Sequence, residues 1–174
     1  MAAKILPVAT FCAGLALGAF SLPLFAQDHP AAGLFKKVEL NFSNWTKGRF
    51  SEAVVVSHPA KFITIAGIGA ESEENGKTLY PGDVLGQCRY AFSKIKKALA
   101  SQGATLADVT RMITFMTDMG GGTRESAKPY RDYNTCKKEA FGGGPLPAGT
   151  IVQVTRLASP DMLIEINIDA VRPD

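Results

Sequence analysis

The chain has 174 residues, of which 46% are hydrophobic and 20% are charged, and its formal net charge is +3. This size suits one globular domain with one core, and so small a net charge does not indicate a nucleic-acid-binding protein. His29 and His58 are the only histidines and show no metal-ligand spacing, so the sequence predicts no metal and no other cofactor.

Residues 1–26 are typical of a secretory signal peptide. Lys4 is the only charge in this segment, and an apolar run follows from Ile5 to Leu24. The chain turns polar at Gln27, which favours cleavage after Ala26. An uncleaved anchor is the alternative, because the run is nearly long enough to span a bilayer. The sequence favours a secreted or periplasmic protein with no stable membrane span after signal removal.

An N-terminal arm, residues 27–50, precedes the predicted domain of residues 51–174. Alternation of apolar and polar residues predicts strands over Ser51–Ser57 and Lys61–Ile68. The turn residues between them indicate a hairpin. Asp83 is a candidate helix cap, and apolar residues then recur every three or four positions up to Gly103. A strand rich in β-branched residues is expected over Val109–Thr117.

A second helix is expected over Glu125–Phe141, ended by the glycines that follow it. Two further strands are predicted over Thr150–Leu157 and Leu163–Val171. The last strand has two different faces, since successive side chains of a strand point in opposite directions. Its isoleucines share one face with Ala170, and its polar residues, Glu165, Asn167 and Asp169, share the other.

The predicted order is β-β-α-β-α-β-β, an α+β domain in which two helices cover one face of a single sheet. This arrangement leaves the opposite sheet face without a covering layer. Solvent, a subunit interface or a ligand pocket must satisfy the polar row on that face.

The C-terminal half resembles the RidA/YjgF family, some members of which have been called endoribonucleases (L-PSP). The family's P-A-R-S/T segment corresponds to Pro147–Thr150, its V-x-V-x-R-L strand to Val152–Leu157, and its final I-E-I-E strand to Ile164–Asn167. Short matches upstream extend the likeness over roughly residues 50–172. The resemblance implies a homotrimer in which three sheets form a barrel, with clefts for small molecules between subunits.

This chain departs from the family where its deaminase branch holds the substrate carboxylate. The arginine of that branch is Gly149 here, and a guanidinium is suited to the task because it donates two parallel hydrogen bonds. The pocket tyrosine of the family is replaced by Ala53. The resemblance assigns ligand-binding positions to Asn134, Gly149 and Thr150, and it makes Glu165 the candidate catalytic residue that orients water. We expect Gly149 to leave open space for a larger ligand.

Two function classes remain from the sequence. The first is a small-molecule-binding protein without standard 2-imino acid deaminase activity. The second is an imine or enamine deaminase with an altered substrate, in which Glu165 activates water. Cys88 and Cys136 fall on the two predicted helices, where they are either a disulfide or two buried thiols.

Overall fold

The computed structural model describes residues 34–58, 61–121 and 126–173; the predicted signal peptide lies outside these ranges. The strands are β1 (Lys36–Leu40), β2 (Ala53–Ser57), β3 (Lys61–Ile68), β4 (Val109–Met116), β5 (Ala148–Gln153) and β6 (Ile164–Arg172). The helices are α1 (Val84–Ser101) and α2 (Lys128–Phe141), and the short 3-10 turns are η2 (Asn44–Thr46) and η3 (Leu106–Asp108). Neither described α-helix is long and apolar enough to cross a membrane.

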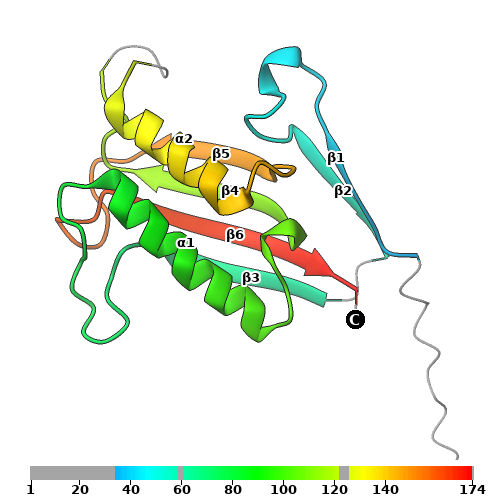
Figure 1. The fold of residues 1–174 in the computed structure, drawn as a ribbon, viewed down its shortest axis with the longest axis horizontal. Coiled ribbons are helices and arrows are strands. Elements are labelled where there is room, and N and C mark those ends of the chain that lie inside the picture. Colours follow the sequence, from blue (N-terminus) through cyan, green and yellow to red (C-terminus); the bar gives the residue numbers. More distant parts are fainter. Residues whose placement is uncertain (1–33, 59–60, 122–125, 174) are drawn as a thin grey trace, which may run out of the picture.

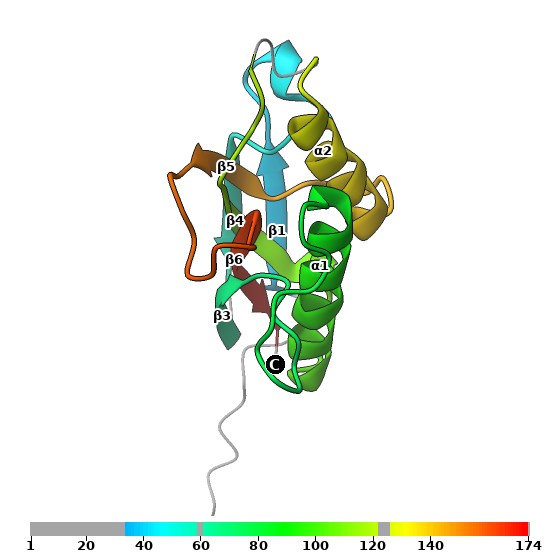
Figure 2. The same ribbon diagram turned by 90° about the vertical axis from the view of Figure 1, so that its left-hand side faces the viewer.

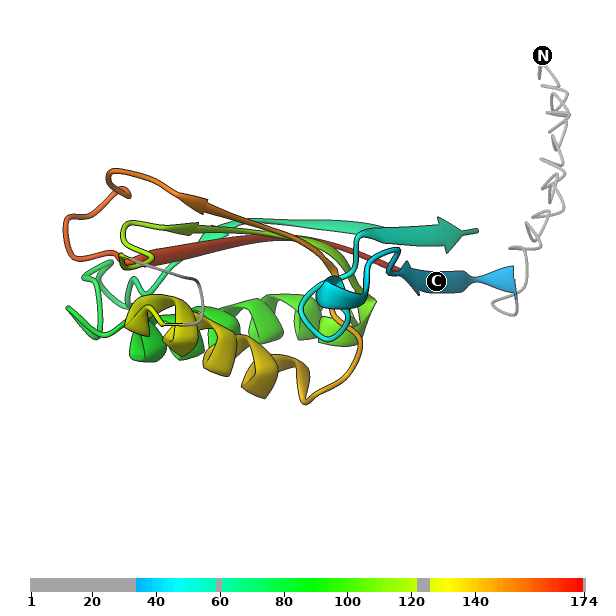
Figure 3. The ribbon, with the colours of Figure 1, turned by 90° about the horizontal axis from the view of Figure 1, so that it is seen from above.

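The main sheet has four strands in the order β3-β6-β4-β5. Strand β6 is antiparallel to both of its neighbours, whereas β4 and β5 are parallel and are connected through α2. Both helices lie on the same face of this sheet, as Figures 2 and 3 show. No described element covers the other face. The α+β fold and its two helices on one face are confirmed.

The core lies between the helices and β6. Ile164, Ile166, Ile168 and Ala170 are at most 2% exposed, and they pack against residues of α1 such as Ile95. Each fully buried aliphatic side chain contributes about 1.5–3 kcal/mol relative to an exposed one. The two faces predicted for the last strand are therefore confirmed.

The expected hairpin between residues 51–57 and 61–68 is wrong. Strand β2 pairs with β1 to form a separate two-stranded sheet, which projects to one side of the domain in Figure 1, and β3 pairs with β6. Alternation identifies strands but not their partners. Pairing with β6 places Ile63 and Ile65 beside Ala170 and Ile168, which extends the apolar face under the helices.

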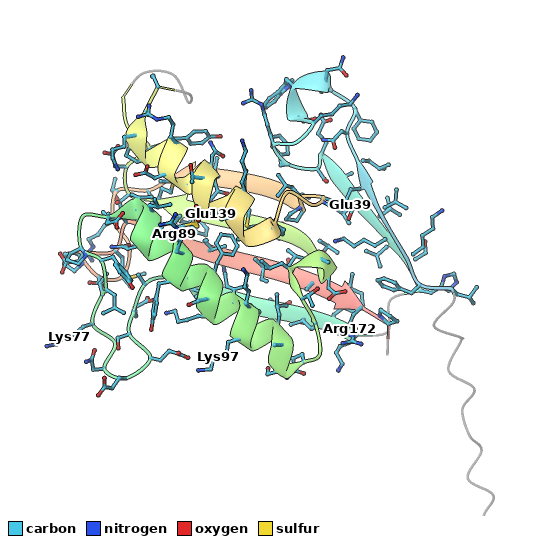
Figure 4. All side chains as sticks on the ribbon, in the orientation of Figure 1. Glu39, Lys77, Arg89, Lys97, Glu139 and Arg172 are labelled. Atoms are coloured by element: carbon cyan, nitrogen blue, oxygen red, sulfur yellow. A yellow bond between two sulfur atoms is a disulfide. The ribbon has the colours of Figure 1, made fainter. Side chains whose placement is uncertain are left out.

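The two helices are joined by a covalent bond and by an ion pair. Cys88 of α1 and Cys136 of α2 form a disulfide, with their Cα atoms 6.2 Å apart and both side chains buried. On the outer surface, Arg89 donates two hydrogen bonds to Glu139, and Figure 4 shows these side chains directed toward each other. The disulfide fixes α2 against α1, and α2 in turn forms one wall of the site described next.

Candidate functional site

A cavity of about 240 Å³ lies between α2, the start of β5 and the segment that precedes β2. We call it the α2 cavity. It is lined by Trp45, Arg49 and Phe50 from the N-terminal segment, Tyr130, Tyr133 and Lys137 from α2, Met112 from β4, Leu146 and Pro147 from the segment before β5, and Gly149, Thr150 and Ile151 from β5. None of these lining residues carries a carboxylate.

The N-terminal wall of the α2 cavity is a loop organised around the carboxylate of Glu52. This carboxylate accepts hydrogen bonds from the backbone N–H groups of Phe42 and Ser43, from Ser43 Oγ at 2.9 Å and from Thr46 Oγ1 at 3.0 Å. These bonds, led by that from the Ser43 backbone, hold the pKa of Glu52 below its ordinary value. The charged carboxylate therefore stabilises the loop that carries Trp45.

Three contacts dock this loop onto the domain. The Ser51 N–H donates to the Pro147 carbonyl at 3.0 Å, and the Ser51 hydroxyl donates to the Leu146 carbonyl. Lys137 Nζ donates to the Arg49 carbonyl at 2.9 Å. The two walls of the cavity come from distant parts of the sequence and are held together by these bonds.

Lys137 is the unusual residue of the α2 cavity. Its side chain is only 8% exposed, and its Nζ lies 5.2 Å from the ring centroid of Tyr133. Burial, followed by the charges of Lys138 and Arg49, lowers the pKa of Lys137 to about 8. Burial also raises the pKa of Tyr133 to about 12, and its hydroxyl shares a hydrogen bond of 3.1 Å with Thr114 Oγ1.

The structure brings three of the predicted site residues to this region. Gly149 and Thr150 line the α2 cavity, and Asn134 lines an adjoining cavity of about 390 Å³. Gly149 opens onto the α2 cavity, but a Cβ built on it would lie 3.2 Å from the Cβ of Phe50, which is tighter than an ordinary contact. Phe50 therefore narrows the space beside Gly149, and the entry of a larger ligand there stays a prediction.

The fourth predicted residue, Glu165, lies on the opposite face of the sheet. Gly149 is paired with Met112, which faces the helices, whereas Glu165 is paired with Phe115, which faces away from them. Within one chain the structure therefore does not bring Glu165 together with Gly149.

The Glu165 carboxylate rests on Gly67 in the β3 bulge. A Cβ on Gly67 would lie 2.5 Å from Glu165 Cδ, so the Glu165 side chain lies directly over the backbone of Gly67 and would have to move if that residue were larger. Burial, and secondarily the charge of Glu71, raises the pKa of Glu165. The bulge in β3 thus places Gly67 where the side chain of Glu165 comes close to the backbone.

Comparison with known proteins identifies the family. The sequence model described as Endoribonuclease L-PSP matches residues 43–172. The chain belongs to this family. A RutC family protein of Pyrococcus abyssi is 30% identical over 119 residues, which are 68% of this chain and 83% of that protein. The RutC family protein YjgH of Escherichia coli is 33% identical over 84 residues, 48% of this chain and 59% of that protein.

The solved structures agree with this assignment. The Rid family protein YyfB of Yersinia pestis, of unknown function, has 25% sequence identity and a TM-score of 0.63, and the match covers 79% of this chain and 98% of that one. The resemblance to the RidA/YjgF family is therefore confirmed. Among residues 34–58, 61–121 and 126–173, no three His, Cys, Asp or Glu side chains are grouped so that they could hold a metal ion.

Sequence reasoning missed the residues that give this L-PSP family member its cavity, namely Trp45, Phe50 and Lys137. One signal for Lys137 was present in the sequence: it follows Tyr133 by four positions, which places a lysine on the buried stripe of α2. Phe50 lies three positions before Ala53, the residue aligned with the family tyrosine, and supplies a ring to the cavity.

Proposed function

We propose that this L-PSP family protein binds a small anionic molecule with a planar, apolar body in the α2 cavity, and that it lacks standard 2-imino acid deaminase activity. The observation that carries the proposal is a buried ammonium group among aromatic rings, with no carboxylate on any described lining residue. A pocket of this kind, mostly apolar with a few convergent polar groups, is typical of small-molecule sites.

The charge of Lys137 supports an anionic ligand. A buried ammonium group is unfavourable unless it is paired, and within the described residues Nζ has one hydrogen-bond acceptor, the Arg49 carbonyl. A ligand carboxylate would accept one of the remaining N–H groups. The adjoining cavity adds Lys47 and Lys138 to the same rim, so that the approach to the site is also basic.

The aromatic residues support a planar ligand. The rings of Trp45 and Phe50 meet edge to face at 5.6 Å, and those of Tyr130 and Tyr133 lie 6.3 Å apart on the facing helix. Trp45 is 55% exposed, which is unfavourable for so large a ring. A flat ligand between the two groups of rings would cover it.

Two observations argue against standard deaminase activity. Gly149 stands where the deaminase branch has its carboxylate-binding arginine, and Phe50 occupies the adjacent space. Glu165, the residue expected to place water, faces the other side of the sheet.

We also propose that the protein is an exported homotrimer. The uncovered sheet face carries apolar side chains, including Phe62 at 74% and Val152 at 37% exposure. On the same face the Oδ1 atom of Asn167 is buried and has no hydrogen-bond partner among the described residues, and a second copy could supply one. The disulfide between Cys88 and Cys136 supports export to an oxidising compartment. Light scattering of residues 27–174 that gave a stable monomer at micromolar concentration would refute the trimer.

One observation favours an imine or enamine deaminase as a second candidate. Because burial and Glu71 raise the pKa of Glu165, this carboxyl group is closer to the range useful for general acid–base catalysis than an ordinary glutamate. Such a site would lie on the uncovered face, between subunits of a trimer. Release of ammonia from 2-iminobutanoate at the rate of an intact family member, and its loss in Glu165→Gln, would favour this candidate over ours.

The binding proposal can be tested without a label, because Trp45 is the only tryptophan in the chain and lies in the cavity wall. Benzoate, phenylpyruvate and phenyl phosphate are titrated while tryptophan emission is recorded. At least one should quench or shift the emission saturably, and Lys137→Gln should weaken that binding about ten- to a hundredfold, since hydrogen bonds to charged groups contribute roughly 1.5–3 kcal/mol.

The matched control is Lys96→Gln, which removes an exposed lysine of α1 that lines neither cavity. This variant should bind nearly as well as the wild type. If none of the three probes changes the emission, or if both variants lose affinity equally, the proposed cavity site is wrong.

A further inference from the structure

The side chain of Lys137 is held in a way that suits covalent chemistry as well as ion pairing. Lys137 lines both the α2 cavity and the adjoining cavity, so it lies beside a ligand in either. One N–H is donated to the Arg49 carbonyl at 2.9 Å, and this bond positions the nitrogen. The geometry is that of a fixed amine beside an aromatic-lined space.

We propose that Lys137 captures small aromatic aldehydes that carry an anionic group, as a reversible imine on its side-chain nitrogen. The proposal rests on the α2 cavity being a ligand site, as inferred above. It assigns to Lys137 a covalent role, which ion pairing alone does not require.

Only a neutral amine attacks a carbonyl carbon, and the surroundings of Lys137 favour that form. Burial lowers its pKa to about 8, so that roughly a tenth of it is neutral at pH 7, against roughly one in three thousand for an ordinary lysine.

The groups that face this nitrogen also favour the neutral amine. Lys138 on α2 and Arg49 on the N-terminal loop are cationic and disfavour a third positive charge. Tyr130 and Tyr133 present rings and hydroxyl groups, and the residues of β4 and β5 that line the cavity carry no acidic or basic side chain.

The reaction needs no partner other than the aldehyde. The nitrogen lone pair forms a bond to the carbonyl carbon, and the carbonyl electron pair moves to oxygen, which takes a proton from nitrogen. The resulting carbinolamine loses its hydroxyl group together with the remaining proton on nitrogen as water, and the nitrogen lone pair forms the carbon–nitrogen double bond. Water reverses both steps, so the adduct forms and hydrolyses at equilibrium without an oxidant or a reductant.

The rest of the cavity specifies the class of aldehyde. The rings of Trp45, Phe50 and Tyr130 suit an aromatic body, and Lys47 and Lys138 on the rim of the adjoining cavity suit an anionic group. We therefore expect para-carboxybenzaldehyde to react faster than benzaldehyde, which has the same ring and aldehyde but no charge.

The test is reductive trapping on the full mature protein. The wild type is incubated with para-carboxybenzaldehyde and sodium cyanoborohydride, which reduces imines and spares the disulfide, and the adducts are located by peptide mapping. Lys137 should be modified at least about tenfold faster than any other lysine, in keeping with its larger neutral fraction. Excess benzoate should slow trapping at Lys137 and leave the exposed lysines unaffected.

Variants make the assignment specific. Lys137→Arg keeps the charge and removes the nucleophile, so it should lose the fast adduct, whereas Lys96→Arg, at an exposed lysine of α1 that lines neither cavity, should retain it. The wild-type peptide map decides the question even if a variant does not fold.

The outcomes separate this proposal from the binding proposal. If benzoate shifts the emission of Trp45 but Lys137 is modified no faster than Lys138, the cavity binds anions and the imine proposal is overturned. If benzoate, phenylpyruvate and phenyl phosphate leave Trp45 unchanged and Lys137 shows no preferential adduct, both proposals are overturned. Preferential trapping at Lys137 that benzoate slows supports both.

Discussion

Replacing Lys137 with methionine should change how the stability of the protein depends on pH. The folded protein holds the Lys137 proton with a pKa of about 8, against the ordinary value of 10.5. The gap corresponds to roughly 3 kcal/mol, since each pKa unit is worth about 1.4 kcal/mol. Lys137 is almost fully buried, so solvent screens little of this cost.

The sign follows from which state holds the proton more tightly. At pH 7 both states are protonated, so folding bears the full cost of burying the charge. As the pH rises, the folded protein loses the proton near 8 and the unfolded chain only near 10.5. The unfolded state then binds more protons, and the free energy of unfolding rises. Relative to Lys137→Met, the wild type should gain roughly 2 kcal/mol between about pH 7 and about pH 9.5.

Urea unfolding followed by circular dichroism at both pH values measures this difference, with Lys96→Met on α1 as the exposed control. Tyr133 does not disturb the comparison, because it is present in all three proteins. The expected linkage is refuted if the stability of the wild type and Lys137→Met changes in parallel with pH, or if Lys96→Met differs from the wild type as much as Lys137→Met does.

Three further predictions follow from the loop, the glycine and the disulfide. Gly149→Arg should lower the melting temperature and cost about 1–3 kcal/mol of stability, because its Cβ would press on Phe50. Phe50→Ala in the same chain should recover most of that loss, and an unchanged melting temperature in the single variant would contradict the crowding. The pKa of Glu52 is lowered, so its support of the loop is complete above the ordinary value of 4.5 and is lost as the pH falls through the folded value. Tryptophan emission should therefore shift to the red in acid, and Glu52→Gln should show that shift already at neutral pH. Reducing the bond between Cys88 and Cys136, 48 positions apart, should cost about 4 kcal/mol in urea unfolding; a change below about 1 kcal/mol would argue against the loop-closure account.

The main sheet and its covering helices could be predicted from the sequence because the pattern is local. Ile164, Ile166 and Ile168 alternate with polar residues, and that alternation assigns their direction without knowledge of any other strand. The partner of β2 could not be predicted in the same way. Its apolar residues suit several partners, and the choice depends on β1, which the sequence showed only as part of an arm of uncertain structure.

The sequence predicted where the candidate site lies but not which side chains line it. Resemblance placed Gly149, Thr150 and Asn134 in one region, and the structure does so too. Phe50 reaches Gly149 only because hydrogen bonds to Glu52 shape the preceding loop, and such contacts leave no periodic signal. Sequence alternation gives the relative face of two residues on one strand, but it cannot relate Glu165 on β6 to a residue on β5.

Because the N-terminal loop forms one wall of the α2 cavity, the cavity depends on the equilibrium between the docked and the undocked loop. The cavity exists only while the loop, with Ser51 and Arg49, is bonded to the domain. A ligand that requires the docked state therefore binds with an apparent affinity reduced by the undocked fraction. Substitutions in the ladder between β1 and β2 can thus strengthen or weaken binding without touching the ligand. In related sequences, affinity can therefore change through substitutions in the two-stranded sheet of β1 and β2 while the cavity walls stay unchanged.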